Sequence, residues 1–225
     1  MSREGYCWGV STAQAPTLAE DKRQATVERI LRAARYLIGA RGLDMTMDEI
    51  AAAAGVGRRT VFRHFESREN LLAAAVESGM RRYGERLPPY EGGDWRPWLE
   101  RLCLEVHRMN GSYGPGYWEL TTRRDLPGEL AAMEERRRRA RRAAMNRLSA
   151  DLWKAAGGKG PTPAGVADSV GAHLSVHFTA AVTADAGQDW KRAASLAFAS
   201  IVSSVETSLA AGRGHSAHPA KGEPS

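Results

Sequence analysis

The stretch from Leu43 to Leu72 constrains the fold of this chain more than any other part of the sequence. It holds two short helical patterns that are separated by the run Gly55-Val56-Gly57. Glycine adopts the left-handed backbone conformation that a tight turn between two helices demands. The second pattern is rich in cationic and hydrogen-bonding side chains, and its outward positions are Arg58, Arg59, Thr60, Phe62, Arg63 and His64. Together these features predict a helix-turn-helix motif whose second helix enters a groove of DNA.

Capping signals and apolar spacing place the helices around this turn. Thr46, followed three residues later by Glu49, forms a capping box, so we expect a helix to begin directly after Thr46. Ser67 is the expected cap of a later helix. A first helix is predicted between Asp21 and the glycines of the Gly39–Gly42 segment, which end it. Its apolar stripe consists of Val27, Ile30, Leu31, Ala34, Leu37 and Ile38.

The order of these features resembles the N-terminal domain of the tetracycline-repressor (TetR) family of transcriptional regulators. The resemblance covers about Thr26 to Ser78 and rests on two patterns, G-V-x-x-x-T-[VL]-[FY]-x-x-F and S-[KR]-E-x-L-L. It implies an all-α, TetR-like fold in which a three-helix DNA-binding head is joined to a larger helical domain for ligand binding and dimerisation. It also implies that the outward positions named above form the recognition helix, and that Thr46 and Arg68 contact phosphates.

Three residues depart from the usual pattern of that family. Gly57 stands where a Ser or Thr cap is usual, Phe62 where Tyr is common, and His64 where an aromatic residue is usual. Because Phe62 has no hydroxyl group for a phosphate, we expect it to pack against sugar or a thymine methyl group. Arg58 and Arg59 could each read guanine through bidentate bonds or hold phosphates, and both roles remain open.

The rest of the chain divides at changes in composition and periodicity. The expected segments are a flexible N-terminal arm (1–20), the helix-turn-helix domain (21–67), a connecting helix (68–87), a ligand-binding and dimerisation domain (88–212) and a disordered tail (213–225). Prolines and glycines between Leu87 and Gly93 end the connecting helix. Asp94 caps the next helix, and a long helix is expected from about Asp125 to Ala156.

Aromatic side chains gather in the C-terminal part of the sequence. We predict that a ligand pocket there is lined by Trp95, Trp98, Met109, Tyr113, Tyr117, Trp118, His177 and Phe178. The segment from Met109 to Trp118 is the expected mobile wall. Alternatively, these side chains are simply the core of a helical bundle.

Two apolar stripes rich in small residues follow the joint between Gly157 and Pro163. Helices that are apolar or small over much of their circumference need more cover than one neighbour provides, which favours a symmetric homodimer. The predicted dimer interface includes Val170, Leu174, Phe198, Ile201 and Val205. The family resemblance implies the same use of the last two long helices.

Six arginines between Arg136 and Arg142 follow Glu134 and Glu135. This run could form a second nucleic-acid surface. The favoured interpretation is a solvated face with i, i+4 pairs between Glu134 and Arg138 and between Glu135 and Arg139. The run lacks the interleaved hydrogen-bonding side chains that base readout needs.

Composition limits the remaining functions. The chain has 225 residues and a net charge of +6, so a polyanionic partner is plausible. We find no G-x-S-x-G, P-loop or H-E-x-x-H motif, and we expect no enzyme, no cofactor and no metal. His173 and His177 are spaced as two metal ligands could be, but no third ligand is identifiable and hydrogen-bonded imidazoles are favoured. Without a continuous run of about 18 apolar residues, a cytoplasmic protein without a membrane partner is expected.

The sequence therefore predicts a ligand-responsive transcriptional regulator that binds pseudo-palindromic, double-stranded operator DNA as a homodimer. The family resemblance implies a repressor that a small apolar or amphipathic effector releases from DNA. Two alternatives remain. The chain could be a small-molecule-binding helical dimer or enzyme whose basic head is incidental, or a protein that coats DNA nonspecifically through its arginine-rich helix.

Overall fold

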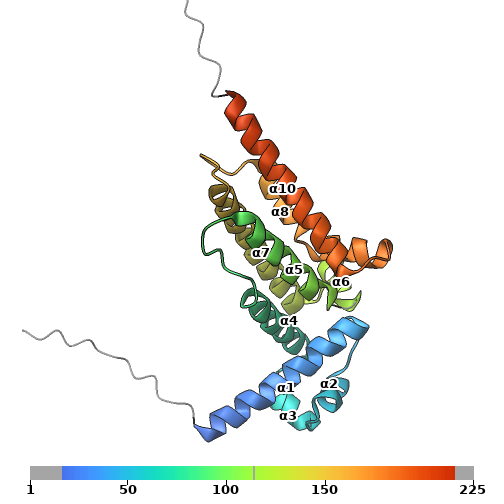
Figure 1. Ribbon diagram of the computed structural model, residues 1–225. Coiled ribbons are helices and arrows are strands. Elements are labelled where there is room, and N and C mark those ends of the chain that lie inside the picture. Colours follow the sequence, from blue (N-terminus) through green and yellow to red (C-terminus); the bar gives the residue numbers. More distant parts are fainter. Residues whose placement is uncertain (1–16, 114, 216–225) are drawn as a thin grey trace, which may run out of the picture.

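The computed structural model describes residues 17–113 and 115–215, and these residues form helices without any strand (Figure 1). The helices of the head and the connecting helix are α1 (Leu18–Arg41), α2 (Met47–Ala54), α3 (Arg58–His64) and α4 (Arg68–Gly84). Those of the body are α5 (Trp95–Gly111), α6 (Pro115–Thr122), α7 (Gly128–Ala155), α8 (Ala164–His173), α9 (Val176–Ala180), the π-helical turn η1 (Ala181–Asp185) and α10 (Trp190–His215). The predicted all-α fold is confirmed.

The turn between α2 and α3 forms as its local chemistry demands. The Thr46 hydroxyl accepts from the backbone N–H of Glu49, and the Glu49 carboxylate accepts from the backbone N–H of Thr46 at 2.7 Å. The bond from the Thr46 backbone N–H, followed by the bond from Arg41, holds the pKa of Glu49 below its usual value. Gly55 has a φ of 62°, in the left-handed region, and Val61 on the inner side of α3 is fully buried. The predicted capping box and helix start are confirmed.

The first helix differs from its prediction at both ends. It begins at Leu18 rather than Asp21, because Thr17 and Glu20 form a second capping box that the apolar stripe does not reveal. Gly39 lies inside α1, and Gly42 alone follows its end with a φ of 75°. Residues 18–20 are thus helical, and the remainder of the predicted arm, residues 1–16, lies outside the described ranges.

Two hydrophobic cores organise the molecule. The first core unites α1 to α4 with Leu120 of α6 and with Leu130 and Met133 of α7. The second core lies between α5, α7, α8 and α10, and Cys103 is buried in it as a small hydrophobic residue. In Figure 1, α4 runs between the head at the bottom and the body above it. Because α6 and α7 contribute to the first core, head and body share apolar packing.

The expected single stripe before α10 is broken into two helices. Helix α8 ends at His173, and the Ser175 hydroxyl accepts from the backbone N–H of Phe178 to cap α9. Ser175 favours the N-cap position of a helix. It therefore starts a new helix at a point where the apolar periodicity alone predicted one continuous helix. Helix α10 continues to His215, past residue 212, where the ligand-binding and dimerisation domain was predicted to end. Residues 216–225 lie outside the described ranges.

The first turn of α6 packs directly onto the C-terminal end of α1. A Cβ atom placed on Gly116 would lie 2.1 Å from the carbonyl oxygen of Ile38 and 2.3 Å from the backbone nitrogen of Gly42. Backbone atoms cannot rotate away as a flexible side chain can. Glycine is therefore required at position 116 for the body to approach the head this closely.

We predict that Gly116→Ala destabilises the fold, because the added methyl group forces α6 and the end of α1 apart. The expected loss in the free energy of unfolding is about 1–3 kcal/mol, measured by urea denaturation. Gly128→Ala is the matched control, since a Cβ atom there meets nothing within 4 Å. Equal stability of the two variants would contradict the close contact.

Candidate DNA-binding and ligand sites

Helix α3 presents four exposed side chains on its outer side: Arg58, Arg59, Phe62 and Arg63. Phe62 is 44% exposed and lies between these cations. Thr60 and His64 are half-buried at the edges of this face. The structure thus brings together the predicted recognition positions, with cations flanking one exposed aromatic ring.

The two adjacent arginines of this face are not equivalent. Arg58 pairs with Asp48 of α2 at 2.8 Å, and its guanidinium carbon lies 5.3 Å from the centre of the Phe62 ring. Among the described residues, Arg59 makes no ion pair or hydrogen bond. Because exposed ion pairs contribute little, Arg58 can exchange Asp48 for a nucleic-acid partner. The Arg59 guanidinium is available to a partner without the loss of a contact within the described residues.

Arg68 lies inside the head instead of on its outer face. Its guanidinium donates to the carbonyl oxygens of Leu43 and Met45 and pairs with Glu69 at 2.9 Å. These bonds fasten the start of α4 to the loop between α1 and α2. Thr46, the other expected phosphate contact, is exposed, although its hydroxyl group is used in the capping box. A phosphate contact by Arg68 would compete with three existing bonds.

A basic hollow of about 450 Å³ lies beside α3, at the N-terminal end of α1. Its walls include Lys22, Arg23, Arg63 and His64. Burial, followed by the charges of Arg63 and Arg23, lowers the pKa of His64 and favours its neutral form. Sequence reasoning missed Lys22 and Arg23, because polar residues at the start of a helix have no periodic signal that relates them to a distant recognition helix.

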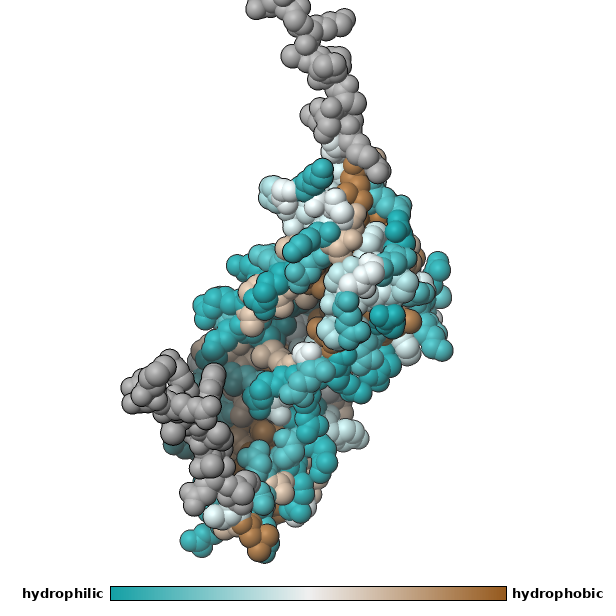
Figure 2. Space-filling view, turned by 60° about the vertical axis from the view of Figure 1, so that its left-hand side comes forward, coloured by the Kyte–Doolittle hydropathy of each residue, from teal (hydrophilic) through white to brown (hydrophobic). Residues whose placement is uncertain are grey.

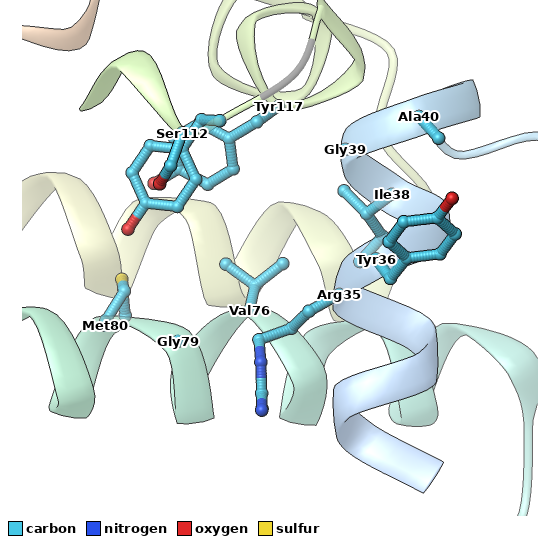
Figure 3. Close-up of a pocket in the computed structure, with 11 residues that line it drawn as sticks. Arg35, Tyr36, Ile38, Gly39, Ala40, Val76, Gly79, Met80, Ser112 and Tyr117 are labelled. Carbon is cyan, nitrogen blue, oxygen red and sulfur yellow. The ribbon is translucent and has the colours of Figure 1, made fainter. Parts of the chain in front are cut away.

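A cavity of about 380 Å³ lies at the junction between head and body (Figure 3). We call it the junction cavity, and it is lined by Arg35, Tyr36, Ile38, Gly39, Ala40, Val76, Gly79, Met80, Ser112, Tyr113 and Tyr117. Figure 3 shows Val76 and Met80 rising from α4 towards Ser112 and Tyr117, with α1 forming the opposite wall. The rings of Tyr113 and Tyr117 stack with centres 4.3 Å apart. The lining is mainly apolar and aromatic, as small-molecule sites usually are.

Only Tyr113 and Tyr117 of the eight predicted ligand residues line this cavity. Trp95, Trp98 and Met109 are buried as core, and the indole N–H of Trp98 donates to the Pro88 carbonyl oxygen at 2.9 Å. Trp118 and Phe178 are half-buried and His177 is exposed, and none of the three lines the junction cavity. These six side chains do not line the junction cavity, and the two tryptophans of α5 pack in the core shared with α10.

His173 and His177 do not share a helix face. The break between α8 and α9 separates them, and Nδ1 of His173 lies 2.8 Å from the carbonyl oxygen of Ser169 in its own helix. No group of three or more His, Cys, Asp or Glu side chains that could hold a metal ion occurs within residues 17–113 and 115–215. The spacing of the two histidines therefore does not produce a two-ligand face.

The arginine-rich part of α7 forms the two predicted pairs, Glu134 with Arg138 at 2.9 Å and Glu135 with Arg139 at 3.3 Å. The expectation that the whole run is solvated is wrong, because Glu134 is only 3% exposed and also binds Arg137 at 2.6 Å. Four of the six arginines are exposed, and Arg137 and Arg141 are half-buried. Glu77, Glu134, Glu135 and the Gly171 carbonyl oxygen are the partners of five of them.

The predicted dimer residues lie mostly inside the protomer. Val170, Leu174, Ile201 and Val205 are buried in the second core, and Phe198 is half-buried. A side chain enclosed within one chain has no surface to offer a second copy. These four residues instead pack α8 and α10 against the body.

Comparison with known proteins agrees with this architecture. Residues 30–75 match the family described as "Bacterial regulatory proteins, tetR family". The uncharacterised HTH-type transcriptional regulators MT1294 and Rv1255c of two Mycobacterium tuberculosis strains, CDC 1551 / Oshkosh and H37Rv, are each 32% identical to this chain over 123 residues. Each match covers 52% of this chain and 60% of the relative.

Two crystal structures of NalD, the secondary repressor of the MexAB-OprM multidrug efflux pump in Pseudomonas aeruginosa, have a similar fold. Each has a TM-score of 0.57 and 22% sequence identity, and the match covers 81% of this chain and 96% or 97% of NalD. The head and fold define a helix-turn-helix protein of the regulator class. The head of this chain, residues 30–75, matches the tetR family of bacterial regulatory proteins.

We predict that Arg68→Met destabilises the head, because two backbone carbonyl oxygens lose a charged donor. The expected loss is about 2 kcal/mol in the free energy of unfolding, measured by chemical denaturation. Arg32→Met is the control, since Arg32 is exposed on α1 and should change stability by no more than about 0.5 kcal/mol. An equally small effect at Arg68 would mean that its bonds do not hold the head together.

Proposed function

We propose that this protein is a transcriptional regulator, that it binds a pseudo-palindromic operator as a homodimer, and that a small molecule in the junction cavity controls its DNA binding. The observation that carries this proposal is the exposed face of α3, where Arg58, Arg59 and Arg63 flank Phe62 within a tetR-family head. An incidental basic head would not need an exposed phenylalanine ring among these cations. We further propose that the protein acts in the cytoplasm, where operator DNA is accessible.

The proposed DNA contacts fall into two groups. Arg59 and Phe62 face the major groove, with Arg59 donating to guanine and Phe62 packing against sugar or a thymine methyl group. Lys22, Arg23 and Arg63 surround the basic hollow and attract the phosphate backbone. Base contacts supply specificity, whereas phosphate contacts fix the register of the helix on the duplex.

The proposed dimer uses the surface of α10 that the protomer leaves uncovered. Within the described residues, Trp190–Gly212 of α10 is the one stretch long and apolar enough to cross a membrane by length and composition, and only 28% of its most apolar window is buried. An apolar helix with this much exposure needs further cover. A second copy provides it symmetrically through half-buried Phe198, Val202 and Leu209. Figure 2 shows apolar surface near the C-terminal end of α10, on a face that is otherwise largely hydrophilic.

The junction cavity is the proposed regulatory site. A molecule bound there would touch α1 of the head, the connecting helix α4, and the end of α5 with α6 of the body. A ligand that prefers one arrangement of these helices shifts the population towards it and changes the separation of the two recognition helices in a dimer. NalD is a repressor, and we propose the same sign of control here, with the ligand releasing the DNA.

Arg59→Ala tests the assignment of α3. We expect about a 10- to 100-fold loss of affinity for the operator and a much smaller loss for scrambled DNA, because Arg59 supplies base readout. Fluorescence anisotropy would compare DNA from the protein's own upstream region with scrambled DNA at several salt concentrations. Arg142→Ala, an exposed change on α7, should leave both affinities unaltered. A parent protein that does not prefer its upstream DNA would refute the regulator proposal.

Val202→Glu tests the dimer surface. A charge on the half-buried side of α10 should convert a dimer into a monomer, which sedimentation velocity would detect. Operator affinity should fall with it, because each monomer engages only one half-site. Ala131→Glu, on an exposed part of α7, should leave the dimer intact. A Val202→Glu variant that stays dimeric would place the interface elsewhere.

A further inference from the structure

Arg35 of α1 lines the junction cavity and also binds the connecting helix α4. Its Nη1 donates to the Ser78 hydroxyl oxygen of α4 at 2.8 Å, and its Nη2 donates to Glu28 at 3.0 Å. Ser78 is only 3% exposed, so the bond from Arg35 lies in a place that water does not easily reach. Figure 3 shows Arg35 reaching from α1 towards α4, beside Val76. One wall of the cavity is therefore also a link between the head and the connecting helix.

A shared carboxylate extends this link along α4. Oε1 of Glu28 accepts from Arg35 and also, at 2.7 Å, from Arg82 of α4. We call Glu28, Arg35, Ser78 and Arg82 the α1–α4 link. Two side chains of α1 are thus fastened to two side chains of α4. Because the charge of Arg35 already has a carboxylate partner, its contacts explain it as a connection between helices and not as an anchor for an anion.

Gly79 of α4 provides the room that the Arg35 stem occupies. A Cβ atom at position 79 would lie 3.2 Å from Cδ of Arg35, which is closer than two carbon atoms pack without strain. Gly79 lies inside α4, where glycine is less favourable than alanine because it loses more backbone freedom on folding. Gly79 and Arg35 both line the cavity. Since Arg35 is bound at its tip and confined at its stem, a group that presses on the stem must move the guanidinium away from Ser78.

We propose that Arg35 couples the junction cavity to the orientation of the DNA-binding head. This proposal rests on the proposed regulatory site and names the residue through which that site acts. A molecule in the cavity pushes the Arg35 stem aside, the bond to Ser78 breaks, and this part of α1 is released from α4. The head then adopts several orientations on the body, and the two recognition helices of a dimer no longer match both half-sites. Arg35 is a positioning residue, because in this scheme it does not contact DNA.

Gly79→Ala tests the coupling without a ligand, because its methyl group presses on the Arg35 stem as a bound molecule would. We expect the affinity for the operator to fall at least about fivefold. The melting temperature should be no lower than that of the parent, because alanine favours the helix. Gly84→Ala, also in α4, is the matched control, since a Cβ atom there meets nothing within 4 Å, and it should leave operator affinity unchanged. Fluorescence anisotropy of the full chain would compare DNA from its own upstream region with scrambled DNA.

A double-mutant cycle shows whether Arg35 carries the effect. Arg35→Met keeps an unbranched apolar stem but loses the bonds to Ser78 and Glu28, so operator affinity relative to scrambled DNA should fall at least about fivefold. Adding Gly79→Ala to this variant should lower operator affinity by no more than a further twofold or about that. Ser78→Ala removes the acceptor on α4 without a change of charge and should weaken operator binding in the same direction. Losses from Arg35→Met and Gly79→Ala that multiply fully would overturn the coupling.

Stability separates coupling from a general loss of packing. A Gly79→Ala protein that binds its operator as the parent does would overturn the inference. A loss of operator affinity together with a fall in melting temperature would show that the methyl group only disturbs packing, which also overturns it.

The operator preference of the parent distinguishes this inference from the proposed function. A parent that prefers its upstream DNA, with Gly79→Ala equal to it, refutes the coupling through Arg35 and leaves the regulator proposal intact. A parent without this preference refutes the regulator proposal and the coupling with it.

Discussion

The contact between α6 and the end of α1 sets the geometry of the whole molecule, because backbone meets backbone there. With no Cβ atom at Gly116, α6 approaches Ile38 and Gly42 closely enough for Leu120 to enter the core of the head. Head and body then share one apolar core along α4. The junction cavity lies beside this contact. Tyr113 and Tyr117 line the cavity and leave the space next to α4 unfilled.

The structure combines two kinds of burial with different consequences. Apolar stripes on α5 and α10 form a closed core that fixes the body, and the tryptophans of α5 belong to it. The arginine run on α7 is different, since most of its side chains are exposed and the one buried carboxylate, Glu134, pairs with Arg137 and Arg138. Charged side chains there are paired on the edge of the core and not packed within it.

Sequence reasoning succeeded where the governing interactions span three or four residues. The capping box at Thr46, the left-handed turn at Gly55 and the inward position of Val61 all follow from neighbours within one or two turns of helix. It did not indicate which aromatic side chains line the junction cavity, because a tryptophan at helical spacing signals burial but not the neighbour that buries it. The same limit misplaced four dimer residues, whose burial occurs within one chain.

The sequence by itself determined the helical class, the helix-turn-helix and the outward composition of α3, because propensity, capping and turn chemistry act locally. Only the tertiary structure decided that Arg58 pairs with Asp48 while the Arg59 side chain has no partner within residues 17–113 and 115–215, and that Arg68 binds the loop between α1 and α2. These outcomes depend on helices that are far apart in the chain and meet in space. Periodicity shows that a face is covered, whereas packing decides what covers it.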